Sequence, residues 1–331
     1  MKRTCPVLIA FFFLISGCSS DGSDSIAAPD PTLEITSNNA LLVANIAYAA
    51  ALESQQLGDS GGGFFIGSAP GGVTKIAGDV VTAAKSGTGN SGSQIPIPAE
   101  TVPCAAEGTM TISGQIADIV TPTLSAGDYF QYEYSACDDG LGDVKNGTVR
   151  TDIDAFSGDL NTGLFSMTMT FTLTNFQVSI FENQSTTPTE VITSTGGATI
   201  TADATSFPYV SSSASGNSLV IDTLNSSEAL TVFASTFTVD GDVVTSPYTH
   251  SSSGTLDSTQ LAGVIRYSNS VTFAGLGVDY PNSGEFLVEG LASSLRLFAE
   301  DNVNVRIEID LGADGTIDET INTTWASLTA S

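Results

Sequence analysis

The sequence predicts an all-β protein whose strands form an antiparallel meander of roughly a dozen members. From Gly108 onward, short runs that alternate apolar and polar residues are separated by turn residues almost to the end of the chain. No long helical pattern interrupts these runs, so consecutive strands have to be antiparallel neighbours. Only 14% of the residues are charged, and serine, threonine and glycine fill the polar positions instead, a composition typical of exported strand-rich proteins.

Strands with one apolar face have to cover that face. The run from Val303 to Leu311 has an apolar residue at every odd-numbered position and polar residues between them, which predicts one buried and one solvated face. We expect the sheet to roll into a barrel-like form, and a sandwich of two packed sheets is the alternative.

The strand expected at residues 164–181 changes its alternation partway along. Apolar residues occupy alternate positions up to Leu173 and resume at Phe176, so the pattern slips by one residue. Such a slip would turn the core face to water, and a β-bulge near Thr174 and Asn175 would absorb it. The dipeptides Asn-Gly at 146–147 and Asp-Gly at 240–241 predict short hairpin turns.

One helix is expected before the strands. The Ser-Asn-Asn sequence at 37–39 can cap a helix that begins at residue 40 and ends at Gly58. Its apolar residues lie on more than one face, which predicts a helix buried against or inside the sheet. The Gly/Ser/Pro-rich stretch 58–101 is expected to be a connection that contains at most one short helix.

The first residues have the pattern of an export signal. Lys2 and Arg3 precede nine apolar residues at 7–15, less than half of the ~20 that a membrane-spanning helix needs. Two small residues then run directly into Cys18. This arrangement resembles the lipobox of bacterial lipoproteins, and the resemblance implies cleavage before Cys18 and fatty acylation of that residue, for example by palmitate.

The resemblance also divides the chain into segments. Residues 1–17 would be a signal peptide, 18–32 a lipid-anchor tether, 33–101 the helix with its connection, and 102–331 the β-rich domain. Two or more acyl chains hold a protein stably at a bilayer. Ser19 stands in place of the aspartate that is typical of inner-membrane retention in enteric bacteria, so we expect an anchor in the outer membrane, in either leaflet.

The charge balance excludes nucleic acid as a partner. The chain has 36 acidic and 9 basic residues, and its net charge of -27 repels phosphate backbones and anionic lipid surfaces. An acidic surface that keeps the protein soluble is the plainer interpretation of this charge, and cation binding is the alternative.

Two cysteines follow Cys18. In an oxidising compartment, Cys104 and Cys137 are expected to form one disulfide. Neither cysteine belongs to a CxxC pair or has a neighbouring histidine in the sequence, so a structural bridge is favoured over redox or zinc chemistry.

The sequence patterns do not indicate an enzyme. His250 is the only histidine, and its surroundings predict an exposed position where a strand runs into a polar turn. Neither the G-x-S-x-G pattern nor the H-E-x-x-H pattern occurs. Two facing carboxylates would suit a glycan hydrolase, but nothing marks out one pair among 36 acidic residues.

The strongest candidate for a ligand site is the stretch 310–318, DLGADGTID. Asp310, Asp314 and Asp318 recur every four residues around a glycine-bearing turn, and calcium is bound by carboxylate oxygens in such tight loops. The stretch resembles the Asp/Gly-rich calcium loops of exported bacterial proteins, although the EF-hand order of donors is absent. A plain hairpin turn with Asp-Gly at its tip is the competing interpretation.

Three functions stay open on the sequence alone. The first is a lipid-anchored, non-catalytic cell-envelope protein with a binding or structural role. The second is a carrier whose rolled sheet encloses an apolar ligand. The third and least supported is a carbohydrate-active enzyme. The anchor implies contact with a membrane, whereas the sequence does not say whether a further partner is a protein, a glycan or a small ligand.

Overall fold

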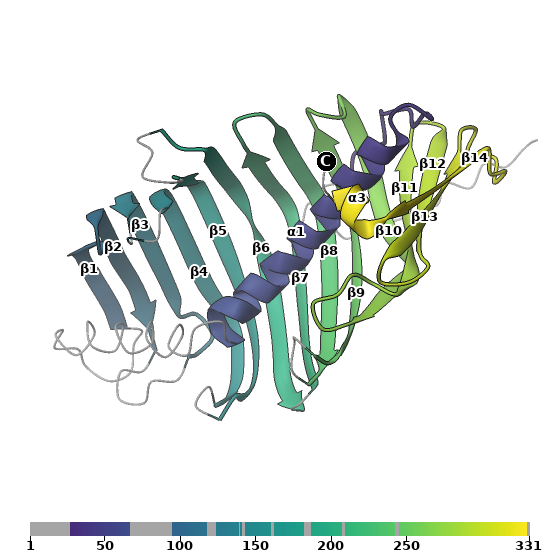
Figure 1. Cartoon of the computed structure of the whole chain (residues 1–331). Coiled ribbons are helices and arrows are strands. Elements are labelled where there is room, and N and C mark those ends of the chain that lie inside the picture. Colours follow the sequence, from purple (N-terminus) through teal and green to yellow (C-terminus); the bar gives the residue numbers. More distant parts are fainter. Residues whose placement is uncertain are drawn as a thin grey trace, which may run out of the picture.

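The computed structural model shows one continuous antiparallel sheet crossed by a helix (Figure 1). It describes residues 27–66, 95–117, 124–138, 140, 143–159, 162–181, 187–206, 209–241 and 245–329. In these residues fourteen strands follow one another across the sheet in chain order, each paired with the next. The expected all-β meander is therefore confirmed.

The strands are longest in the middle of the sheet and become short toward the C-terminus. Their bounds are β1 Ile95–Pro103, β2 Glu107–Ile116, β3 Tyr129–Asp138, β4 Asp143–Asp159, β5 Leu164–Ile180, β6 Glu190–Ser206, β7 Tyr209–Asp222, β8 Ser227–Asp240, β9 Pro247–Ser258, β10 Gly263–Leu276, β11 Ser283–Gly290, β12 Ser293–Ala299, β13 Asn304–Asp310 and β14 Glu319–Thr324. Two helices flank them, α1 at Ala40–Ile66 and α3 at Trp325–Thr329.

The sheet is open, so the expectation of a barrel-like closure was wrong. Closure requires the first and last strands to pair, whereas β1 and β14 are the two edges of this sheet (Figure 1). The edge strand β1 contains Pro96, Pro98 and Pro103, which have no N–H to donate to another strand. Over β6 to β10 the apolar face is covered by α1 rather than by the opposite wall of a barrel.

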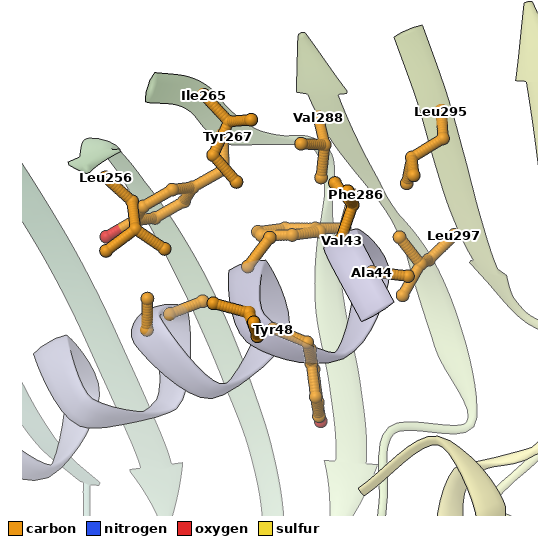
Figure 2. Packing of buried hydrophobic residues seen from close by; sticks show 14 of the residues in the cluster. Val43, Ala44, Tyr48, Leu256, Ile265, Tyr267, Phe286, Val288, Leu295 and Leu297 are labelled. Carbon is orange, nitrogen blue, oxygen red and sulfur yellow. The ribbon is translucent and has the colours of Figure 1, made fainter. Parts of the chain in front are cut away.

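Helix α1 lies across one face of the sheet, here called the inner face (Figure 1). It packs on β6 to β10, β12 and α3. Figure 2 shows its side chains Val43 and Ala44 beside Phe286 and Leu297 of the sheet, and the ring of Tyr48 contacts those of Phe273 and Phe286. The following residues of α1 are buried on several sides of the helix: Ala40, Val43, Ala44, Ile46, Ala47, Tyr48, Ala50, Ala51 and Ser54. The prediction of a buried N-terminal helix is confirmed.

The helix is longer than the sequence indicated. Its backbone continues beyond Gly58 to Ile66, although glycine has a low helix propensity. No helix in the described part of the chain combines the length and the hydropathy of a membrane span.

An aromatic cluster joins α1, the sheet and the C-terminus. The ring centroid of Tyr48 lies 4.9 Å from that of Trp325 and 6.0 Å from that of Phe273. Phe273 in turn lies 6.1 Å from Phe286 on the next strand. Trp325 is fully buried, and its indole N–H donates to the Asp301 carbonyl at 3.1 Å. The start of α1 and the last turn of the chain are therefore held at one point on the inner face.

A second apolar cluster lies on the inner face toward β1. It consists of Ile97, Ile116, Phe130, Ile153, Phe165, Met167, Met169, Ile200, Ala202, Ala204 and Ala214. The three residues of β5 in it are those that the alternation assigned to the core face. On β13, Val305, Ile307 and Ile309 are buried as well, which confirms the one-sided strand over Asn304–Asp310, whereas Val303 and Leu311 lie outside the strand and are exposed.

The predicted bulge in β5 is present. The pairing of β5 with β6 shifts between Leu173 and Phe176, and Asn175 has a φ of 46°. On the other side, β4 shifts beside it at Gly147, whose φ is 93° and whose missing Cβ would lie 2.1 Å from the Asn175 carbonyl oxygen. Only glycine fits that approach. The Asn146-Gly147 pair therefore forms a bulge inside β4, and the expectation of a hairpin turn there was wrong.

The N-terminal segment is attached to the sheet before α1 begins. The N–H groups of Thr32 and Leu33 donate to the Val264 carbonyl at 3.0 and 3.1 Å. The side chain of Arg266 donates to the Pro29 carbonyl and pairs with Asp30 at 2.8 Å. The last residues of the proposed tether thus lie against β10. The signal peptide and Cys18 lie outside the described residues.

The predicted disulfide is formed. Cys104 and Cys137 are bonded, with their Cα atoms 5.5 Å apart. Cys104 follows the edge strand β1 and Cys137 lies in β3, so the bond connects these strands across β2. It therefore fastens the edge of the sheet that is farthest from the aromatic cluster.

Removing this disulfide is expected to destabilise the β1–β3 edge. The double variant Cys104→Ser, Cys137→Ser loses the closure of a loop with a separation of 33 residues, which corresponds to roughly 3 to 4 kcal/mol in the free energy of unfolding on the chain-entropy model. Urea unfolding measures this loss, and hydrogen exchange should locate it in β1–β3. A variant as stable as the oxidised parent would contradict the structural role of the bond.

Candidate functional site

His250 lies in the core and not at an exposed strand end, so that expectation was wrong. It belongs to β9, where its side chain is 2% exposed on the inner face. The opposing residues in the neighbouring strands are Phe237 in β8 and Phe273 in β10. The strand continues farther than the polar sequence around His250 suggested, because α1 covers this part of the sheet.

The imidazole of His250 is kept neutral by its surroundings. Burial lowers its pKa from 6.5 to about 4. Its Nε2 atom has no hydrogen-bond partner among the described residues. A catalytic triad needs a histidine in reach of both a nucleophile and a substrate, and a position beneath a helix does not give that access.

The three aspartates of the 310–318 loop bind the loop backbone. Oδ1 of Asp310 accepts the N–H groups of Gly312 and Asp314 at 3.1 and 3.2 Å, and Oδ2 accepts that of Gly315 at 2.8 Å. Asp318 accepts the Leu311 N–H at 2.8 Å, while Asp314 accepts the Thr316 N–H at the same distance. The carboxylates thus hold the turn between β13 and β14.

The charge of Asp310 is stabilised by those backbone donors. Burial would raise its pKa, but the N–H groups of residues 312–315 outweigh burial and keep the pKa of Asp310 below its ordinary value. In the part of the chain that the structure describes, no group of three His, Cys, Asp or Glu side chains is arranged to hold a metal ion. Calcium binding at this loop remains a prediction.

The outer face of the middle strands carries a regular array of hydroxyl groups. Three outward positions on each of β5 to β9 lie in register across the sheet. We call these fifteen positions the hydroxyl face; in three rows they are Ser166, Asp203, Ser211, Thr238, Thr249; Thr168, Thr201, Ser213, Thr236, Ser251; and Thr170, Thr199, Ser215, Ala234, Ser253. Thirteen of them are serine or threonine.

The strands fix the spacing of this array. Neighbouring strands lie about 4.8 Å apart, and alternate residues along a strand lie about 6.7 Å apart. Some of the hydroxyls are paired across strands, Thr168 with Thr201 at 3.3 Å and Thr170 with Thr199 at 3.1 Å. Every residue of the face is half-buried or exposed, so the hydroxyls face solvent beside one another.

The hydroxyl face is nearly free of charge in a highly acidic chain. Asp203 is its one charged residue, although the sequence has 36 acidic side chains. The threonines at every second position of residues 168–174 were visible in the sequence, but the sequence did not show which strands would align them. The sequence analysis therefore missed this surface, and alternating Ser/Thr in several consecutive strands is the signal that would have found it.

A shallow polar hollow lies on the outer face beside the aspartate loop. Its lining residues are Ser294, Arg296, Glu308, Asp310, Gly315 and Ile317. Arg296 already pairs with Glu285 at 3.2 Å, so its guanidinium is partly neutralised. The mixed charges of this hollow do not favour one class of ligand.

Comparisons with known proteins add no family to these observations. No protein-family model, no curated protein and no solved structure matches the chain.

A substitution in the 310–318 loop distinguishes carboxylates that bind the turn backbone from carboxylates that bind calcium. We expect Asp310→Asn to lower the melting temperature equally in chelator and in millimolar calcium, because the carboxylate oxygens serve the turn backbone. Scanning calorimetry of the parent and the variant measures this. If calcium instead raises the melting temperature of the parent and Asp314→Asn abolishes the rise, the loop is a calcium site, because a ligand of the folded state stabilises it by mass action.

Proposed function

We propose that this protein is a lipid-anchored, non-catalytic component of the bacterial cell envelope, and that its hydroxyl face binds a neutral, hydroxyl-bearing polymer such as a polysaccharide. The observation that carries the proposal is the uniform chemistry of this face, thirteen hydroxyl side chains in fifteen aligned positions.

The chemistry of the face selects the class of partner. Serine and threonine hydroxyls both donate and accept hydrogen bonds, so they match the hydroxyls of a sugar chain. A charged partner would need opposite charges, and a protein partner would favour large aromatic or apolar anchors. The face has neither, since its residues are small and all but one are uncharged.

The shape of the face suits an extended partner. It spans five strands of an open sheet rather than a cleft, so many weak contacts have to act together. One hydrogen bond contributes only about 0.5–1.5 kcal/mol in net free energy. A polymer that repeats its hydroxyl groups can make several such bonds at once, whereas a small sugar can make few.

A lipid anchor at Cys18 would place the protein at the cell envelope, where such polymers occur. Acylation at Cys18 would hold the body at the envelope, and residues 28–33 bind β10, so the free tether would be short. The alternative of an apolar carrier has less support, because the sheet is not closed around a cavity and the apolar side chains of its inner face are already buried. His250 is buried in the core, and the aspartates of the 310–318 loop bind the loop backbone. We therefore favour binding over catalysis.

The anchor predicts where the protein is found in a bacterial cell. The parent should sediment with membranes and gain the mass of its acyl chains, because two or more chains bind a bilayer stably. Cys18→Ser should move it to the soluble fraction. Fractionation and intact-mass analysis measure both results. An unmodified amino terminus in the parent would contradict the anchor and leave the binding proposal to be judged separately.

Binding to neutral polymers is expected to depend on the hydroxyl face. The full-length parent should co-sediment with at least one neutral insoluble polysaccharide in a panel of cellulose and chitin. Replacing Thr168, Thr170, Thr199 and Thr201 by valine removes four hydroxyls at constant shape. We expect the dissociation constant to rise at least tenfold, since each lost hydrogen bond costs about 0.5–1.5 kcal/mol.

A matched control is available at the edge of the sheet. Thr101 and Thr111 form the same kind of hydroxyl pair at 2.8 Å on β1 and β2, outside the hydroxyl face. Their double valine variant should bind as the parent does. A parent that binds none of these polymers, or a quadruple variant that binds equally well, would contradict the proposed function.

A further inference from the structure

We propose that His250 makes the contact between α1 and β8–β10 an acid-sensitive joint, in which a proton on the imidazole releases α1 from this part of the sheet. The inference concerns the stability of the fold and does not depend on the proposed binding function.

The position of His250 beneath α1 follows from contacts on either side of it. The hydroxyl of Ser235, on the inner face of β8, donates to the Ser54 carbonyl of α1 at 2.7 Å. On β10, Phe273 meets the ring of Tyr48, also from α1, at 6.0 Å. Phe273 is opposite His250 in the β9–β10 pairing, and Phe237 is opposite His250 in the β8–β9 pairing. Ser235 lies two residues before Phe237 on the same face of β8. Because α1 also packs on β9 itself, the helix passes over this part of the strand.

The groups that face His250 cannot balance a positive charge. Phe237 and Phe273 are opposite it on the two adjacent strands, and no charged group contributes to its lowered pKa, which burial alone explains. Among the described side chains, the titratable groups on the inner face of these elements near His250 are phenols: Tyr48 of α1, Tyr248 of β9 and Tyr267 of β10. Burial raises the pKa of Tyr248 to about 12 and that of Tyr48 further, so both stay neutral in acid.

Protonation therefore favours an open state. In the closed state the new N–H⁺ on Nε2 would be a buried charge with no acceptor among the described residues. A state with α1 displaced lets water solvate it. The pKa of His250 is lower in the folded state than in the unfolded state. Its contribution to the stability of the closed state is therefore complete above pH 6.5 and decreases as the pH falls toward 4.

The release is expected to be local. α1 packs on β6 to β10, whereas the second apolar cluster extends from β7 to β1 and shares only β6 and β7 with α1, and the disulfide fastens the edge at β1 to β3. The equilibrium constant for opening of α1 should be roughly 50- to 100-fold larger at pH 4.5 than at pH 7.5. This factor follows from proton linkage when the pKa of His250 is 6.5 in the open state and about 4 in the closed state.

Hydrogen exchange on the full-length protein tests the inference. After correction for the intrinsic effect of pH, amides of α1 and β8–β10 should exchange roughly 50- to 100-fold faster at pH 4.5 than at pH 7.5, while those of β3–β5 should not. His250→Leu and His250→Gln, which cannot titrate, should lose most of this acid response. An equal acid response in the parent and both variants, or an increase spread evenly over β3–β5, would overturn the proposal.

A second measurement needs no variant. Because His250 is the only histidine in the chain, its imidazole NMR signal can be assigned directly. We expect no titration of that signal near pH 6.5 in the folded protein, and a change only where α1 amides begin to exchange. A midpoint near 6.5 with unchanged exchange of α1 would overturn the proposal.

Discussion

The structure depends on covering one apolar face of a single open sheet. A sheet of fourteen strands in a simple meander buries nothing by itself, because each strand pairs only with its neighbours. Burial of apolar surface is the main favourable contribution to folding, so the inner face needs a second layer. Helix α1 provides that layer over β6 to β10, and its alanines allow the helix backbone to come close to the sheet.

This requirement explains how the two faces of the sheet differ. The inner face contains the apolar clusters, the aromatic junction at Trp325 and the neutral His250, all of which exclude water. The outer face has no covering layer in the described part of the chain, and over β5 to β9 small hydroxyl side chains keep it hydrated with Asp203 as the one charged residue of the array. The strand alternation thus separates a surface that holds the fold together from a surface that is free to bind.

Local patterns predicted the features that depend on neighbouring residues. The one-residue slip at Leu173 and Phe176 required a bulge, and Asn175 takes the left-handed conformation there. The disulfide was also predicted from the sequence, because Cys104 and Cys137 are the two cysteines of the β-rich part of the chain. The Asn146-Gly147 pair shows the limit of such reasoning. Its sequence favours a turn, but the bulge of the adjacent strand and the close approach of its backbone made it part of β4.

The sequence by itself determined the strand content, the buried character of the helix and the bulge, because alternation and helical period depend on which residues are apolar. It also supplied the lipobox resemblance, which no contact in the described residues addresses. Only the tertiary structure decided that the sheet stays open, that His250 lies under α1, and that thirteen hydroxyls align on one face. These features depend on strand order, register and covering contacts between residues far apart in the chain, and no local period records such contacts.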